Sequence, residues 1–195
     1  MRKDKKVVLI LLIFMTVVIL MTTGCEKDIE NKKESKKYSD LIDYKDALQI
    51  LKEDDEATVL DIKSGITFKV KRVTGGFNTL ADVETLSKYD TEKLLDAIGG
   101  NFSIIRRPVI VTVGNKKIAA SIAPFEHSGR EDKPYGEIID NRSGSTGTGI
   151  NLDSIRENGL IGVIDIYFYN SLTPGINRVD ERHQEMVLEA YDYKG

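Results

Sequence analysis

Alternating apolar and polar positions predict most of the strands of this chain. Residues 57–62 and 66–73 lie on either side of Lys63-Ser64-Gly65, and this pattern predicts a β-hairpin. Residues 109–113 and 117–122 predict a second hairpin, because Gly114-Asn115 between them suits a tight turn. The apolar run 160–169 predicts a central strand, since an exposed edge strand of that composition would favour aggregation.

Apolar residues at spacings of three and four predict three short helices. The first covers about residues 40–52 and either packs on the domain or belongs to a tether. A second covers about residues 90–98 and is closed by Gly99-Gly100. A third follows Asp180, which can cap it. Because strands outnumber helices, we expect an α+β fold, with a mainly antiparallel sheet built from hairpins and two or three short helices.

A basic and then apolar leader precedes these elements. Residues 2–6 carry four basic side chains, residues 7–21 are apolar apart from Thr16, and small residues then lead to Cys25, the only cysteine. A signal peptide has this order of segments. The leader resembles the lipobox of bacterial lipoproteins, with Thr22 at a position where leucine is usual, and the resemblance implies that Cys25 carries diacylglycerol.

An uncleaved membrane helix is the alternative interpretation of the leader. Residues 7–23 lie at the short edge of the roughly 17–25 residues that cross a bilayer. Both interpretations place the rest of the chain outside the cell membrane, since the basic residues stay in the cytoplasm.

The charged segment that follows the anchor predicts a flexible tether. Residues 26–37 contain one apolar side chain and many charges of both signs, so the segment buries too little surface to fold. We therefore expect a lipoprotein signal peptide over 1–24, a lipid anchor, tether and short helix over 25–57, and one α+β extracytoplasmic domain over 58–195.

Charge and cysteine content exclude several classes of function. The chain has 28 Lys and Arg against 31 Asp and Glu, and loss of the basic leader makes the balance more negative. Nucleic acid is therefore not expected as a partner, because phosphate binding needs clustered basic residues. An acylated Cys25 leaves no thiol for a disulfide, a cysteine-ligated zinc or a cysteine nucleophile.

Short motifs follow one another in a recognisable order from residue 58 onward. They are Gly65–Arg72, Ala81–Glu84, Asp90-Thr91, Gly99-Gly100, Arg106–Val109, Ile118–Ser121, Asn177–Asp180 and His183-Gln184. Together they resemble a domain of exported proteins of Gram-positive (clostridial and bacillar) bacteria that is often found beside peptidoglycan-binding modules. The resemblance implies a location in the cell envelope more than a particular reaction.

The motif of that family that carries its reactive side chains, cysteine and histidine, is altered here. Its members carry a His-Phe-Cys-Ile-His-Phe strand after a glycine, followed by Ser-Arg-Thr-His-Gly. In the matching residues 162–175, Asp165 stands at the cysteine position, Val163 and Tyr167 replace the strand histidines, and Pro174 replaces the last histidine. His127 stands where the family has His-Gly. The resemblance therefore implies a degenerate, non-catalytic copy, and we expect neither a metal nor another cofactor.

Four residues remain as candidates for acid–base chemistry or for oxygen–nitrogen metal ligation: Asp82, Glu84, His127 and Asp165. Asp165 lies in an apolar strand, and burial without a partner would raise its pKa. In the alternative interpretation Asp165 faces solvent or pairs with Arg106 or Arg107.

Other polar residues are expected to be structural. His183 lies on the apolar face of the last helix and is expected to pack there. Ser121 and Ser171 have no neighbouring base in the sequence, so no serine triad is predicted. The run 143–149 lacks the lysine of a phosphate cradle and is expected to be a flexible loop, within a stretch (124–149) that is either functional or disordered.

Two functions of different classes follow from these observations. The first is a lipoprotein on the outer face of the cell membrane, anchored in the bilayer through acylated Cys25, with a non-catalytic binding or structural domain. Peptidoglycan or another envelope component would be its partner. The alternative is a cell-wall hydrolase or transferase that uses a carboxylate–histidine site of Asp165 and His127.

Overall fold

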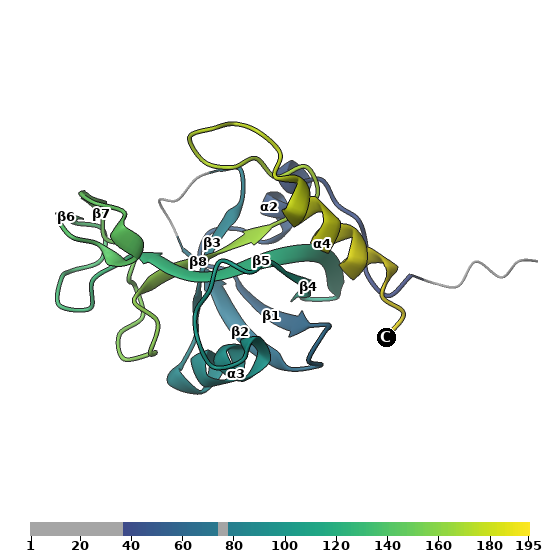
Figure 1. Ribbon diagram of the computed structural model, residues 1–195, viewed down its shortest axis with the longest axis horizontal. Coiled ribbons are helices and arrows are strands. Elements are labelled where there is room, and N and C mark those ends of the chain that lie inside the picture. Colours follow the sequence, from purple (N-terminus) through teal and green to yellow (C-terminus); the bar gives the residue numbers. More distant parts are fainter. Residues whose placement is uncertain (1–36, 74–77) are drawn as a thin grey trace, which may run out of the picture. The chain divides into compact units, whose positions relative to one another are not determined.

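The computed structural model describes residues 37–73 and 78–195, and Lys36–Gly195 forms one compact unit. Six antiparallel strands of this unit close into a barrel in the order β1-β2-β3-β8-β5-β4 (Figure 1). The expected α+β fold, with an antiparallel sheet and three short helices, is confirmed. The predicted leader, Cys25 and residues 26–36 of the predicted tether lie outside the described residues.

The two predicted hairpins form adjacent parts of the barrel. β1 (Glu56–Asp61) pairs with β2 (Thr67–Arg72), and β4 (Arg107–Val113) pairs with β5 (Lys116–Ser128). Alternate side chains of the strands point inward, because successive residues of a strand face opposite sides. The barrel interior is filled by apolar residues, among them Val59, Phe68, Val70, Val83, Val109, Val111, Ile118, Ala120, Ile122, Ile164, Ile166 and Phe168.

Closure of the barrel depends on two strands that are far apart in the sequence. β3 (Ala81–Thr85) pairs with β2 on one side and with β8 (Gly162–Tyr167) on the other. β5 is long enough to pair with β4 over its first half and with β8 over its second half. The expectation that the chain loses regular structure from Pro124 onward is therefore wrong for residues 124–128, which continue β5.

The folded unit begins earlier in the chain than the predicted boundary at residue 58. Helix α2 (Tyr44–Ile50) packs on the barrel, and Ala47, Leu48 and Leu51 belong to the main core. Asp40 and Asp43 also form β-bridges to Ile118 and Tyr169. Of the two interpretations of the first helix, the structure thus favours packing on the domain. The apolar spacing of three and four residues is that of a buried face.

The other two helices pack against different strands of the barrel: α3 (Lys88–Ile98) contacts β2 and β3, and α4 (Glu181–Asp192) contacts β4 and β5. α3 begins after Ser87, whose side chain accepts from the amide of Asp90, and ends at Gly99 in a left-handed conformation. α4 is capped by Asp180, as predicted. Its residues Val187 and Ala190 pack against the outward side chains of β4 and β5.

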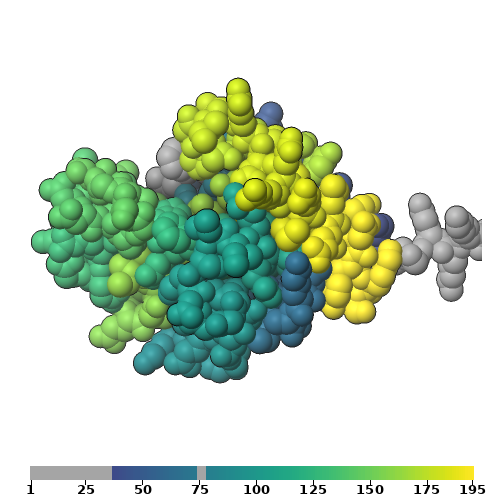
Figure 2. Space-filling view, viewed as in Figure 1, coloured from purple at the N-terminus to yellow at the C-terminus, as the bar shows by residue number. Residues whose placement is uncertain are grey.

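The chain between β5 and β8 forms an arm that projects beside the barrel. The arm contains β6 (Ile138–Ile139), the single turn η1 (Ser143–Ser145) and β7 (Gly149–Ile150), and β6 pairs with β7. Figure 2 shows it as a green lobe at the left of the molecule. Within the arm, η1 packs against β5.

Candidate functional site

Two aspartates face each other on the outside of the barrel. Asp82 of β3 lies directly opposite Asp165 of β8 in the antiparallel register. Their neighbours Val83 and Ile164 point into the core, so both carboxylates point outward on the same face. Like charges placed directly opposite each other destabilise a sheet. A fold retains such a pair more readily when a hydrogen-bond donor lies beside the carboxylates.

His127 supplies that donor because β5 is irregular at this point. Ala123 pairs with Asp165 and His127 pairs with Val163, so β5 takes four residue steps where β8 takes two. Irregularities of this kind bend a strand and re-aim its side chains. As a result Nε2 of His127 lies 2.9 Å from Oδ1 of Asp165. One carboxylate oxygen each of Asp82 and Asp165 and one ring nitrogen of His127 all lie within 4.8 Å of one another.

The second ring nitrogen of His127 has its own partner. Nδ1 lies 2.9 Å from Oγ of Ser128, a residue with a positive φ of 63°. A carboxylate only accepts, so Nε2 carries a proton, and in the neutral ring Nδ1 accepts from the Ser128 hydroxyl. Burial by itself lowers the pKa of His127, but the hydrogen bond and charge of Asp165, with the charge of Asp82, outweigh burial and raise it.

Ser128 was not among the residues that the sequence suggested. The dipeptide His127-Ser128 is the only sequence signal for it, and nothing in that pair indicates a hydrogen bond between the side chains. Asp165 lies 38 residues away from His127. The chain Ser128–His127–Asp165 therefore appears only when β5 and β8 are paired.

These residues line a cleft of about 590 Å³ between the barrel and the arm. Its other walls are formed by Phe125, Arg142, Thr146, Ile150, Leu152 and Pro174. The guanidinium of Arg142 donates to carbonyl oxygens of Thr146, Gly147 and Ile150 at 2.8 to 3.2 Å. The predicted loop 143–149 is thus wrapped around Arg142, which shapes the wall of the cleft.

Glu84 is the one of the four candidate residues that lies apart from the other three and does not line the cleft. Its buried carboxylate accepts from the backbone amides of Ser154 at 2.9 and 3.1 Å and of Ile155 at 3.4 Å, and from the Ser154 hydroxyl. Burial raises the pKa of Glu84 to about 7, although these hydrogen bonds oppose the shift. Glu84 therefore fixes the chain after β7 to the barrel and lies outside the cleft.

The predicted pairing of Asp165 with an arginine is wrong. Arg106 pairs with Asp180 at 2.6 Å, and Arg107 binds Asp61 through two nitrogens at 2.5 and 2.8 Å. Both arginines stand at the start of β4, and β5 lies between β4 and β8. Their side chains are therefore directed to other acidic residues.

His183 and the two serines considered in the sequence are structural. The buried ring of His183 stacks on Tyr167 with centroids 3.6 Å apart, and Nδ1 lies 2.9 Å from Oγ of buried Ser121. Burial lowers the pKa of His183 to about 4, so the ring is neutral at pH 7. Ser171 is also buried, and its hydroxyl accepts from the amide of Phe168.

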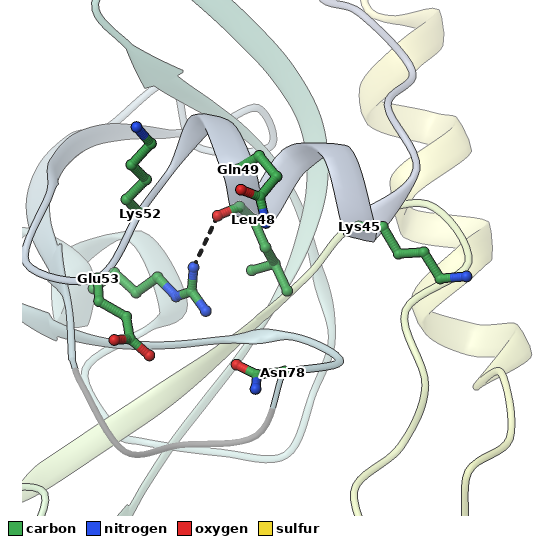
Figure 3. A pocket seen from close by; sticks show the side chains of 7 residues that line it. Lys45, Leu48, Gln49, Lys52, Glu53 and Asn78 are labelled. Atoms are coloured by element: carbon green, nitrogen blue, oxygen red, sulfur yellow. Dashed lines mark hydrogen bonds between the residues drawn. The ribbon is translucent and has the colours of Figure 1, made fainter.

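A second groove, of about 550 Å³, lies beside α2 (Figure 3). It is lined by Lys45, Leu48, Gln49, Lys52, Glu53, Arg72 and Asn78. Arg72 donates to the carbonyl oxygens of Leu48 at 3.0 Å and Leu51 at 2.8 Å. These carbonyls lie at the end of the helix, where intrahelical donors are missing. Arg72 therefore anchors α2 to β2, and the candidate site is the cleft at the arm.

Asp153, at the base of the arm, gives an expected pH dependence of stability. Its side chain has no exposed area, and burial, with the charge of Glu131, raises its pKa to about 6. A carboxyl group whose pKa is higher in the folded state stabilises the fold at low pH, and this contribution is lost as the pH rises from about 4 through about 6. Asparagine has no proton to lose, so we expect Asp153→Asn to reduce the drop in unfolding free energy between pH 4 and pH 7 by up to about 3 kcal/mol.

Urea denaturation at pH 4 and pH 7 measures this effect. Asp132→Asn is the control, because Asp132 is an exposed carboxylate of the same arm. An Asp153→Asn variant that loses as much stability between the two pH values as the wild type would contradict the expected burial of a charge.

Comparison with known proteins adds no further constraint: no protein-family model, curated protein or solved structure matches this chain. Among residues 37–73 and 78–195, no helix is both long enough and apolar enough to cross a membrane.

Proposed function

We propose that this chain is a lipoprotein, anchored through Cys25 to the outer face of the cell membrane, whose barrel binds a cell-envelope component in the cleft. The leader and its terminal cysteine support the anchor. The order of motifs that resembles an exported Gram-positive domain supports the envelope location. Peptidoglycan is the envelope component that this resemblance favours.

The single observation that carries the binding site is the meeting of Asp82, His127 and Asp165 in one cleft. Carboxylates accept hydrogen bonds from hydroxyl, amide and amine groups, all of which peptidoglycan displays on its sugars and peptides. Phe125, Ile150 and Pro174 add apolar surface against which a sugar ring or a methyl group can pack. A few polar groups set in apolar walls are typical of ligand sites.

Binding without cleavage agrees with the surroundings of Ser128. A serine nucleophile needs amide donors for the developing oxyanion, usually including the amide next to the serine. The amide of Gly129 instead donates to Oγ of Ser143 at 3.0 Å. Ser128 is also 7 % exposed, which restricts the approach of a substrate carbonyl. Asp165, at the cysteine position of the resembling family, is a weaker nucleophile than a thiolate.

A second candidate function is hydrolysis of the cell wall. The hydrogen bonds from Ser128 through His127 to Asp165, both 2.9 Å long, have the connectivity of a nucleophile, a base and an orienting acid. In this alternative the Gly129 amide would have to exchange its hydrogen bond with Ser143 for one with the oxyanion. The two candidates differ in whether peptidoglycan is released as fragments.

The test is sedimentation of the detergent-solubilised full-length protein with purified peptidoglycan. We expect wild type to co-sediment, Asp165→Asn to bind about 10- to 100-fold more weakly through loss of a charge-assisted hydrogen bond, and Glu84→Gln to bind like wild type. Chromatography of the supernatant should find no soluble fragments.

Two outcomes would contradict this proposal. Absence of co-sedimentation of the wild type would remove peptidoglycan as the ligand. Soluble fragments that disappear in His127→Ala would establish the hydrolase in place of the binding domain.

A further inference from the structure

The three residues at the centre of the cleft come from three strands and present one donor atom each. Asp82 belongs to β3, His127 to β5 and Asp165 to β8, and their donor atoms lie within 4.8 Å of one another. Ligands of one ion at the usual bond lengths of about 2.0–2.2 Å lie no more than about 4.4 Å apart, so the three side chains must draw slightly closer together to share an ion. The barrel strands fix the backbone of all three, so small side-chain rotations are enough.

The register of the sheet explains why a cation would be favoured here. Asp82 and Asp165 lie directly opposite each other, and Asp82 is 4 % exposed, so solvent screens the two charges poorly. A bound divalent cation would compensate both carboxylates at once.

The partner of the second ring nitrogen suits metal binding as well. A histidine that binds a metal through one nitrogen almost always donates its other N–H to an oxygen, and this orients the ring. With the lone pair of Nε2 directed at an ion, the ring proton moves to Nδ1, where the hydroxyl of Ser128 at 2.9 Å can accept it. Ser128 in its left-handed backbone conformation is thus a positioning residue for His127.

We propose that Asp82, His127 and Asp165 bind one divalent cation, and that Zn²⁺ is the ion that best matches the set. An imidazole with two carboxylates is a donor set that Zn²⁺ accepts, whereas Ca²⁺ and Mg²⁺ prefer oxygen ligands alone. Three protein ligands would leave one position of a tetrahedral ion open, and all three residues line the cleft, from which a ligand could enter. An oxygen of the ligand would occupy the open position.

This inference deepens the proposed function and rests on it only for the identity of the group that enters the open position. Ion binding itself requires no envelope ligand. The ion can therefore be tested with metal alone, and peptidoglycan binding can be tested with and without a chelator.

The experiment is calorimetric titration of the chelator-treated full-length protein, in detergent micelles, with Zn²⁺ alone. We expect one ion per chain. Asp165→Asn and His127→Ala should each weaken binding at least 100-fold, because each removes one of three ligands. Glu84→Gln is the matched control: Glu84 lies two residues from Asp82 on the same face of β3 but outside the cluster, and its variant should bind like wild type.

A second readout identifies the ligating nitrogen. In the imidazole ¹⁵N spectrum of the full-length protein, Zn²⁺ should shift the Nε2 signal of His127, and the Nδ1 signal should have the chemical shift of a protonated nitrogen. Circular dichroism checks that the variants are folded, and Asp165→Asn keeps the size of the side chain.

Three results would overturn the inference: no Zn²⁺ binding by the wild type, unchanged affinity in Asp165→Asn and His127→Ala, or an unshifted Nε2 signal. Sedimentation with peptidoglycan in the presence of a chelator separates the two proposals. Binding that persists there would leave the proposed function standing without the ion, whereas Zn²⁺ binding without peptidoglycan binding would retain the ion and remove the proposed ligand.

Discussion

Gly162→Ala is expected to lower the free energy of unfolding by more than 3 kcal/mol or to prevent folding. Gly162 has a φ of 93°, and a Cβ built there would lie 2.1 Å from the carbonyl oxygen of His127 and 2.5 Å from the nitrogen of Gly129. Both atoms belong to the backbone and cannot rotate away. The start of β8 and the end of β5 thus approach more closely than any side chain would allow.

Gly100→Ala is the matched control for this effect. Gly100 has the same φ of 93°, but a Cβ there would meet nothing within 4 Å. Its replacement should cost about 1–2 kcal/mol, the penalty for a side chain in a left-handed conformation. The difference between the two variants, measured by chemical denaturation, isolates the close approach of the strands. Equal losses in both variants would contradict it.

The same contact positions the candidate site. His127 stands two residues before Gly129, so any displacement of β5 from β8 moves its ring away from Asp165. If Gly162→Ala folds at all, we expect its cleft to lose binding as well as stability.

Cys25→Ser is expected to abolish lipid labelling completely and to release the protein from the membrane or mis-sort it. Serine has no thiol to form the thioether, and the chain has no other cysteine. Metabolic labelling with a palmitate analogue, together with fractionation of cells that express the full chain, measures both effects. Thr23→Ser keeps a small residue before the cysteine and serves as the control that retains the label.

The opposite result would favour the alternative interpretation of the leader. A wild type without lipid, and a Cys25→Ser variant that stays in the membrane with an intact leader, would identify residues 7–23 as a membrane helix. The anchor would then be a protein segment in place of a lipid.

The hairpins of the fold could be predicted because each depends on neighbouring residues. The Gly114-Asn115 turn and the alternation on its two sides correspond to β4 and β5 of the structure. Closure of the barrel could not be predicted in this way, because β3 pairs with β8 across about 80 residues. The second half of β5 was missed for the same reason, since residues 124–128 are held by β8 and lack a periodic pattern of their own.

For the candidate site, likewise, the residue types could be predicted from the sequence, whereas their arrangement in space could not. Asp165 could be chosen from the sequence because it lies in an apolar strand, and His127 because it stands where the resembling family has His-Gly. Asp82 is one of the four candidate residues for the same chemistry. The sequence could not show that Glu84 lies outside the site. Glu84 is on the same face of β3 as Asp82, and only the structure shows that its carboxylate binds the amides of Ser154 and Ile155 instead. The irregularity of β5 that aims His127 at Asp165 is likewise a property of strand pairing.

Binding in the cleft beside the arm is tested most directly by an NMR titration of the compact unit, Lys36–Gly195, with a soluble peptidoglycan fragment. We expect shifts of the amide signals of Asp82, His127 and Asp165 and of the His127 ring, with no change along α4 or beside α2. Shifts confined to the groove around Arg72, or none at any fragment concentration, would contradict binding in the cleft.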